Sequence, residues 1–550
     1  MVGISLRWFE EVFYQVRCHD VLSFRCPVVY SAERIYTGFK PTRYVEAVTV
    51  YGGYVVYAGF LGGAMRAAQE ISTAVGCGKP RLVEFDGVIV PGFVDAHLHI
   101  RGIGATKYSI DLSDTDSLEE LLELVRHEAD RFNDWVIGRG WDQERLGGWP
   151  TRYELDEVVP DKPVVLLRVC GHAAALNTKA MEALGLLESS SPLVDRGCDG
   201  KPTGLVFEEL AAQAYREAIQ SLDPVRLVVE GAEEALRYGI TLAGAMDVDA
   251  HVFKGLVAAR WMGLLRLRLR VYLSQELFEK LDQLGAVPVL GDNLLRVVGV
   301  KLYMDGSLGA RTAWLREPYS DEPGSRGQRL LSAEDLVNIA LRARKWRLDV
   351  AVHAIGDAAV EEALRGFAAS GCKCRLEHAS LAPPDLVEKM ASLGVRVAVQ
   401  PRFLVSDSWA VDRLGPERAR WLYPFRSMLT SGVLLGFSSD APVEPLNPLE
   451  GIYSAVTRGT LAQYTMREAL DVETALHLYT AGSALLLGET RAGCLEPGCF
   501  ADMAVLDRDP LEVDVEEITG IGFNATIVAG ETVWLRSWHA RAWPGPVQPP

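Results

Sequence analysis

The chain has 550 residues, 49% of them hydrophobic and 23% charged, and its formal net charge is -17 at pH 7. This length excludes one small domain and suits a large barrel with accessory structure. The acidic balance argues against nucleic acid or an anionic membrane as a partner, because neutralising phosphates requires clustered Lys and Arg side chains.

The cysteines and the apolar runs bear on the compartment. The nine cysteines are odd in number and dispersed, which argues against a disulfide framework. Cys372 and Cys374 lack a matching second pair, so we expect buried or loop cysteines rather than a metal site. No signal peptide or membrane-spanning run is evident. We therefore expect a cytoplasmic protein that acts on a small molecule, with a homodimer as one option.

The two ends of the chain are predicted to form one domain. Residues 1–26 are an extension whose structure the sequence leaves open. From 27 to 90, short β-type segments with glycine punctuation indicate a small antiparallel sheet, and ADMAVLDRDP and ATIVAGETVWLRS near the C-terminus have the same character. Neither end is large enough to bury a core alone, so we predict a composite β-sandwich of residues 27–90 and 485–540.

Residues 91–484 alternate short apolar strands with helical patterns. Candidate strands include GFVDAHLHI, GITLAGAMD, RVVGVKLYMD, LDVAVHAIGD, CRLEHAS and VLLGFSSDAP. Strands that are apolar along their whole length fit a parallel sheet covered by helices. Eight of them in β-then-α order predict an α/β fold of the (β/α)8 TIM barrel type. An open doubly wound sheet is the alternative, and the polar residues at nearly every strand C-terminus favour the barrel.

A long segment, residues 102–230, interrupts this order after the first barrel strand. An insertion at that point is predicted to overhang the barrel mouth and to form a lid and substrate wall. Trp141 and Trp149 within it, and Trp314 in a later loop, either line the pocket or pack the insertion. His172 either contacts the substrate or has a structural role.

The strongest local signal is the segment from Asp95 to His99, DAHLH, at the end of an apolar strand. Residues two apart on a strand face the same side, so His97 and His99 point inward and are close enough to share one metal ion. Solvated loop histidines are the alternative explanation for this pair considered alone.

Other strand ends strengthen the metal interpretation. His353, His378 and Asp440 each stand where an apolar strand gives way to a polar loop. Four histidines and an aspartate on one rim are hard to explain as core packing, because each buried imidazole would require its own partner. Lys301 ends another strand, where a lysine is costly to bury unless it is paired or modified. A salt bridge to Asp305 and carbamylation by CO₂, which would let Lys301 bridge two metal ions, both remain open.

Taken together, the motifs resemble the amidohydrolase superfamily and its amidohydrolase-3 group, which includes YtcJ-like proteins and N-substituted formamide deformylases. Segments such as PGFVDAHLH, GRGWDQERLGGWP, CGHAAALNT, GVKLYMDGSLGARTA, VHAIGDAAV, RLEHA and SSDAPVEPLNPLEGIYSAVTR carry the resemblance. It implies a barrel with a composite β-sandwich. It also implies metal ligation by His97, His99, Lys301, His353 and His378, with Asp440 as the catalytic acid/base. The segment RVCGH lacks the acidic residue of the usual RxDGH, which puts substrate choice in doubt.

The expected chemistry is hydrolysis of a non-peptide C–N bond in an amide, N-acyl or N-formyl compound. Imidazole and carboxylate ligands suit one or two Zn²⁺ ions, which lower the pKa of a bound water from about 15.7 to about 7. We predict that Asp440 ligates the metal, accepts a proton from that water and delivers it to the leaving nitrogen. His378 is predicted to be a ligand, or an oxyanion donor if one ion is bound.

Other functions remain open at this stage. A deaminase or cyclic amidohydrolase is disfavoured by Lys301, which mononuclear deaminases tend to lack. A non-catalytic scaffold is disfavoured by the complete set of ligands, and nothing specific favours a phosphotriesterase. Arg311 either recognises a substrate carboxylate or closes its own loop by a salt bridge.

Overall fold

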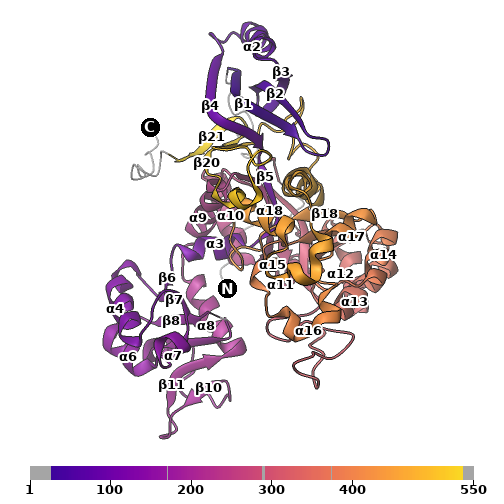
Figure 1. Ribbon diagram of the computed structural model, residues 1–550. Helices are drawn as coiled ribbons and strands as arrows, with labels where there is room; N and C mark the ends of the chain where they lie inside the picture. Colours follow the sequence, from indigo (N-terminus) through magenta and orange to yellow (C-terminus); the bar gives the residue numbers. More distant parts are fainter. Residues whose placement is uncertain (1–25, 170, 288–290, 373, 537–550) are drawn as a thin grey trace. The chain divides into compact units, whose positions relative to one another are not determined.

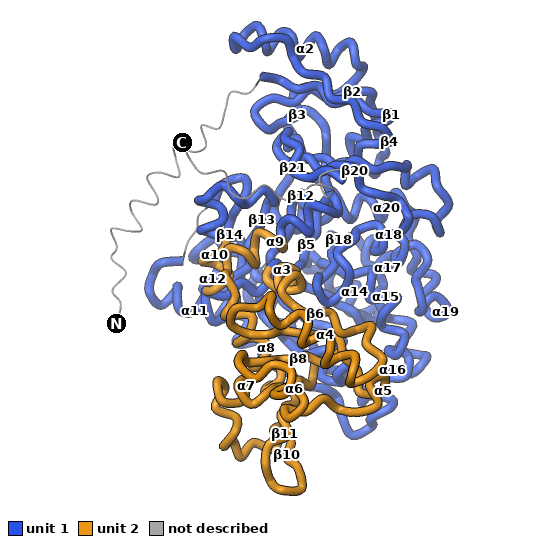
Figure 2. Tube along the Cα trace, turned by 90° about the vertical axis from the view of Figure 1, so that its left-hand side faces the viewer, with its two compact units in different colours: residues 1–100, 232–250, 257–550 blue, residues 101–231, 251–256 orange. Residues whose placement is uncertain are grey.

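A computed structural model describes residues 26–169, 171–287, 291–372 and 374–536 (Figure 1). Residues 1–25 of the predicted extension and Cys170 of RVCGH lie outside the described residues. The chain divides into two compact units, which Figure 2 shows in different colours. Unit 1 comprises residues 1–100, 232–250 and 257–550, and unit 2 comprises residues 101–231 and 251–256.

Unit 1 contains a sheet built from both ends of the chain. Its seven strands have the order β21-β20-β19-β4-β1-β2-β3. Val90 of β4 pairs antiparallel with Ala504 of β19, and this pairing joins the two ends. Helix α2 (Leu61–Val75) packs Ala64 and Ala68 against the sheet. The strands are β1 (Val28–Gly38), β2 (Arg43–Tyr51), β3 (Tyr54–Gly59), β4 (Arg81–Pro91), β19 (Met503–Leu506), β20 (Phe523–Val528) and β21 (Glu531–Leu535).

The rest of unit 1 is the predicted barrel. Eight strands follow one another in chain order around the sheet, and every neighbouring pair is parallel. They are β5 (Phe93–Leu98), β12 (Ile240–Val248), β13 (Arg268–Ser274), β14 (Leu295–Tyr303), β15 (Asp349–Ala354), β16 (Arg375–His378), β17 (Arg396–Val399) and β18 (Leu434–Phe437). Just beyond the last strand, Asp440 N donates to His97 O at 2.9 Å, and His99 N donates to Ala441 O at 2.8 Å. These bonds tie the last strand's end to the first, so the TIM barrel is confirmed and the open doubly wound sheet is excluded.

The helices on the outer face of the barrel begin and end at residues that commonly cap helices. Helix α12 (Ala333–Lys345) starts where the Ser332 side chain accepts from Asp335 N. Helix α14 (Pro384–Leu393) has a proline in its first turn and ends at Gly394, which has a φ of 61°. Between them lies α13 (Asp357–Ser370), whose apolar face is buried. Other helices of this unit are α11 (Gln275–Gln283), α17 (Phe425–Thr430), α18 (Pro448–Thr457) and α20 (Val472–His477).

Unit 2 is a globular unit with its own hydrophobic core. Its six-stranded sheet has the order β10-β11-β9-β8-β7-β6. The strands are β6 (Ile110–Asp111), β7 (Val136–Trp141), β8 (Val164–Arg168), β9 (Ala173–Leu176), β10 (Val194–Arg196) and β11 (Pro202–Phe207). Its helices include α4 (Leu118–Glu128), α6 (Arg152–Val158), α7 (Thr178–Ala183) and α8 (Glu208–Gln220). A lid function of the insertion stays a prediction.

The expectation that the chain lacks a disulfide framework is wrong. Disulfides join Cys26 to Cys77, Cys372 to Cys374 and Cys494 to Cys499. Cys26 and Cys77 are 51 residues apart, and each comes a few residues before a strand, β1 or β4. The parallel pairing of these strands, Val28 beside Arg81, brings the Cα atoms of the two cysteines to 5.5 Å.

Among the described residues, no helix combines the length and the apolar character needed to cross a membrane.

Candidate metal centre

Three predicted ligands meet at the C-terminal end of the barrel strands. His97 lies in β5 and His99 follows it, while Asp440 comes three residues after β18. Asp440 Oδ1 is 3.2 Å from His97 Nε2 and 3.1 Å from His99 Nε2. One ligand-capable atom from each residue lies within 4.8 Å of the other two, which is the geometry of a shared metal ion.

His353 and His378 extend this group from the ends of β15 and β16. The His378 ring centroid is 5.2 Å from that of His97 and 4.5 Å from that of His353. Both His378 and Asp440 have positive φ, 72° and 61°, which is uncommon for residues other than glycine. Such backbone conformations cost energy and cluster at functional sites.

Lys301, in β14, is buried with only 1% of its surface exposed. No carboxylate among the described residues lies within ion-pair distance of its amine. Asp305, its predicted partner, instead accepts the backbone N–H groups of Trp314, Ile355 and Gly356. The salt bridge to Asp305 is therefore wrong. Burial lowers the pKa of Lys301, although Glu377 and Asp440 oppose this effect.

The protonation states of the group suit a cation. Burial lowers the pKa values of His97 and His353, and it lowers the pKa of His378 to about 3. These imidazoles are therefore neutral at pH 7, which is the form that ligates metals. Burial alone would raise the pKa of Asp440, but the neighbouring histidines hold it below its ordinary value. Asp440 is therefore ionised.

Two buried polar atoms indicate that the group fits a metal. His378 Nδ1 and Asp440 Oδ1 are buried, and neither has a hydrogen-bond partner among the described residues. A buried polar atom left unpaired costs about 1–3 kcal/mol. Nitrogen and oxygen donors that converge in this way are suited to Zn²⁺ and related divalent ions. The residues present thus fit a metal centre.

Sequence reasoning missed the residues that hold this group. Glu377 Oε2 lies 2.6 Å from His97 Nδ1, and Glu377 also accepts from Arg375 Nε. Asp95 accepts from His97 N and Ser439 N and so links the first strand to the end of the last. Burial raises the pKa of Asp95 to about 7. A signal was present in the sequence, because Arg375 and Glu377 are charged residues two apart in a short strand that ends in His378.

Comparison with known proteins agrees with this geometry. A family model described as "Amidohydrolase family" matches residues 86–534. The chain belongs to the amidohydrolase family. The putative amidohydrolase YtcJ of Bacillus subtilis (strain 168) is 31% identical over 534 residues, covering 92% of this chain and 98% of that protein. N-substituted formamide deformylase of Arthrobacter pascens is 26% identical, covering 88% of this chain and 94% of that protein.

A solved structure supports the same assignment. An uncharacterized metal-dependent hydrolase from Pyrococcus horikoshii OT3 has a TM-score of 0.81 and 36% identity, covering 89% of this chain and 99% of that one. The predicted resemblance to the amidohydrolase family is thereby confirmed.

The structure gives the predicted substrate residues other contacts. Trp141 is fully buried in the core of unit 2, and its Nε1 donates to Leu166 O at 2.8 Å. Trp141 therefore has the packing role that the sequence left open. Arg311 Nη2 lies 2.8 Å from Asp321, so this arginine closes its loop by a salt bridge.

Two other candidates are partly exposed. The His172 side chain is 47% exposed, and its Nδ1 lies 2.9 Å from Glu208. The Trp149 ring packs edge-on against Trp141, with the centroids 5.6 Å apart. A substrate contact by His172 stays a prediction. Trp314 lies in unit 1, where its backbone N–H donates to Asp305.

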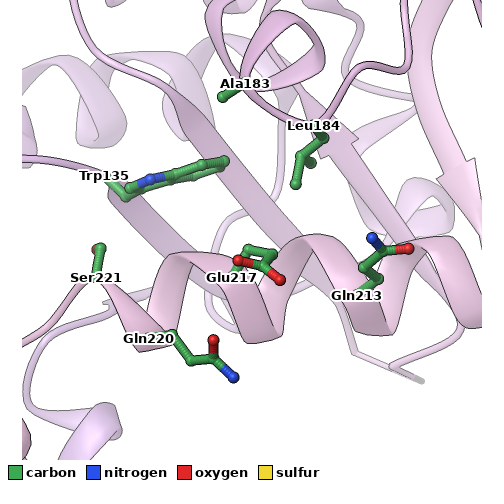
Figure 3. Close-up of a pocket in the computed structure, with 7 residues that line it drawn as sticks. All are labelled: Trp135, Ala183, Leu184, Gln213, Glu217, Gln220 and Ser221. Carbon is green, nitrogen blue, oxygen red and sulfur yellow. The ribbon is translucent and has the colours of Figure 1, made fainter. Parts of the chain in front are cut away.

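Unit 2 also contains an open cavity of about 520 Å³ that the sequence did not indicate. Figure 3 shows its lining, which combines the Trp135 ring with helix-borne polar side chains. The lining residues are Trp135, Ala183, Leu184, Gln213, Glu217, Gln220 and Ser221. This set contains one carboxylate and no histidine, so it offers neither a metal site nor an acid–base pair.

Proposed function

We propose that this amidohydrolase-family protein hydrolyses a non-peptide C–N bond, in a linear amide, N-acyl amine or N-formyl amine, at a divalent metal centre. The observation that carries the proposal is the convergence of His97, His99 and an ionised Asp440 beside two neutral imidazoles. The similarity to N-substituted formamide deformylase supports the choice of a linear C–N bond.

The ligand set of this proposal is His97, His99, Lys301, His353, His378 and Asp440, and the preferred ion is Zn²⁺. When bound, such an ion acidifies water and polarises a carbonyl oxygen. As a carbamate, Lys301 would offer carboxylate oxygens that could help to hold a second ion. Its burial near three histidines supports this role, as does the lack of an ion pair to its amine among the described residues.

Asp440 is the proposed acid/base. Its carboxylate lies among the imidazoles and is ionised, so it can accept a proton from the attacking water and return it to the leaving nitrogen. General acid–base help of this kind typically contributes about 10²–10⁴-fold. His378 is a ligand or donates to the developing oxyanion, and no described residue is a hydrogen-bond partner of its Nδ1.

The proposed substrate is a small molecule, and the net charge of -17 gives no support for a nucleic-acid or anionic-membrane partner.

The test is a screen of the full chain after metal analysis and reloading with Zn²⁺, Mn²⁺ or Co²⁺. Release of amine from N-formyl and N-acyl amines is measured beside cyclic amides and aminated heterocycles. We expect turnover of the linear substrates only. Asp440→Asn should retain most of the metal and lose turnover. Hydrolysis of cyclic substrates alone, or full activity of Asp440→Asn, would overturn the proposal.

A further inference from the structure

Arg375, Glu377 and His97 form a buried chain of charged and polar groups inside the barrel. Their exposed fractions are 0%, 0% and 1%. Arg375 and Glu377 are two residues apart on β16, so both side chains point to the same face of the strand. Glu377 places one oxygen 2.6 Å from His97 Nδ1 and accepts from Arg375 Nε with the other. Arg375 Nη2 also donates to Ala96 O at 3.0 Å, next to His97.

This chain determines which nitrogen of His97 carries the proton. A carboxylate held beside a guanidinium can only accept hydrogen bonds, so the proton of His97 lies on Nδ1. Its Nε2 then presents a lone pair toward Asp440 Oδ1, 3.2 Å away. Asp440 Oδ1, a carboxyl oxygen for which the described residues supply no hydrogen bond, offers a lone pair of its own. Two acceptors in buried contact repel each other unless a cation lies between them.

We propose that Glu377 is a positioning residue that selects the metal-binding tautomer of His97, and that Arg375 holds Glu377 in the required orientation. This inference rests on the proposed function, because it assumes that His97 ligates the metal. A carboxylate behind a ligating histidine fixes its ring and raises its basicity, and loss of such a partner typically costs about 10–100-fold in metal affinity.

The orientation imposed by Arg375 makes Glu377→Gln an informative change. The glutamine must turn its carbonyl oxygen toward Arg375, because a guanidinium has no acceptor. Its amide NH₂ group then faces His97 Nδ1, which has to give up its proton and accept. The proton moves to Nε2, where it points at Asp440 and blocks ligation. The variant thus keeps the shape of the side chain and reverses the tautomer.

The experiment measures Zn²⁺ affinity by competition with a chromophoric chelator, and the His97 tautomer by ¹⁵N NMR of the metal-free, histidine-labelled full chain. We expect Glu377→Gln to bind Zn²⁺ about 10–100-fold more weakly. Its His97 signal should change from protonated Nδ1 to protonated Nε2. Adding Arg375→Met frees the amide to rotate, so the double variant should recover part of the lost affinity.

A matched control lies elsewhere in the same unit. Glu489 forms a buried ion pair with Arg270 at 2.8 Å, and its ion-pair partners in the described part of the chain are all arginines. Glu489→Gln makes the same chemical change, so it should lower the thermal midpoint and leave both Zn²⁺ affinity and the His97 tautomer unchanged.

Three results separate the hypotheses. Wild-type Zn²⁺ affinity and a protonated Nδ1 in Glu377→Gln would overturn the role of Glu377. If Glu377→Gln does not fold, Glu377→Asp keeps the charge but withdraws the carboxylate from His97, and unchanged affinity there would overturn it equally. Absence of Zn²⁺ binding by the wild type would instead remove the metal centre of the proposed function, while the NMR measurement would still test the tautomer.

Discussion

One methyl group added at Gly244 should disturb the candidate metal centre by displacing the strand that carries His97. This glycine lies in β12, beside β5, which carries His97. A Cβ atom at Gly244 would lie 2.2 Å from the carbonyl oxygen of Ala96 and 2.9 Å from Leu487 Cδ2. Because close C···O contacts in proteins are about 3.3 Å, the two strands must separate by about 1 Å.

We therefore expect Gly244→Ala to weaken the site more than it weakens the fold. Overpacking of this kind costs about 1–3 kcal/mol of stability. Metal sites tolerate about 0.2 Å in ligand distance, and a misplacement of about 1 Å costs about 10²-fold in rate. Zn²⁺ affinity, turnover and the thermal midpoint are measured together.

Gly38→Ala is the control for this change, because no atom of the described residues lies within 4 Å of the Cβ position of Gly38. It should behave like the wild type in all three measurements. If Gly244→Ala binds Zn²⁺ as tightly as the wild type and turns over at the same rate, the strands can relax without moving His97. The reasoning from the close approach would then be refuted.

Three further predictions follow from single features. Lys301→Ala should bind one metal equivalent fewer by elemental analysis, because the proposed carbamate would help to hold a second ion; unchanged stoichiometry would exclude that role. Replacing Cys26 and Cys77 by serine opens a cross-link of 51 residues, worth about 4 kcal/mol from loop entropy. In oxidising buffer the thermal midpoint of this double variant should be lower than that of the wild type, and under reducing conditions the two midpoints should match. Equal midpoints without reductant would show that the disulfide does not stabilise the fold. Burial, reinforced by Glu444, raises the pKa of Asp407 to about 7. The pKa of Asp407 is higher in the folded than in the unfolded state, so the folded state favours the protonated carboxyl. The free energy of unfolding therefore decreases as pH rises from about 4 through about 7. Asp407→Asn should therefore gain thermal stability over the wild type at pH 8 relative to pH 5, and a pH-independent difference would contradict the shift.

The barrel and the residues at its mouth could be predicted from the sequence because of a general property of parallel barrels. In a parallel barrel all strand C-termini lie on one face, so polar residues that end successive strands must meet there. His353, His378 and Asp440 were predicted by this rule, and the spacing of His97 and His99 on their strand added that pair. Their grouping required no knowledge of packing, because strand order follows chain order.

Contacts that depend on register were not predictable in the same way. Glu377 and His97 are 280 residues apart, and their contact depends on how β16 faces β5 across the barrel. The pairing of Cys26 with Cys77 likewise required the alignment of β1 with β4. For Trp141 the sequence left pocket lining and packing of the insertion both open, and the insertion's own core, which includes the indole, decided for packing.

By itself, the sequence therefore determined the class of fold, the family and the residues that end the barrel strands. Periodicity and strand-end chemistry are local properties, and one chain displays them directly. Only the tertiary structure decided which oxygen faces which nitrogen, which cysteines join and which aromatic rings are buried. Those choices depend on side chains from distant strands reaching the same few ångströms of space, and no local pattern encodes that distance.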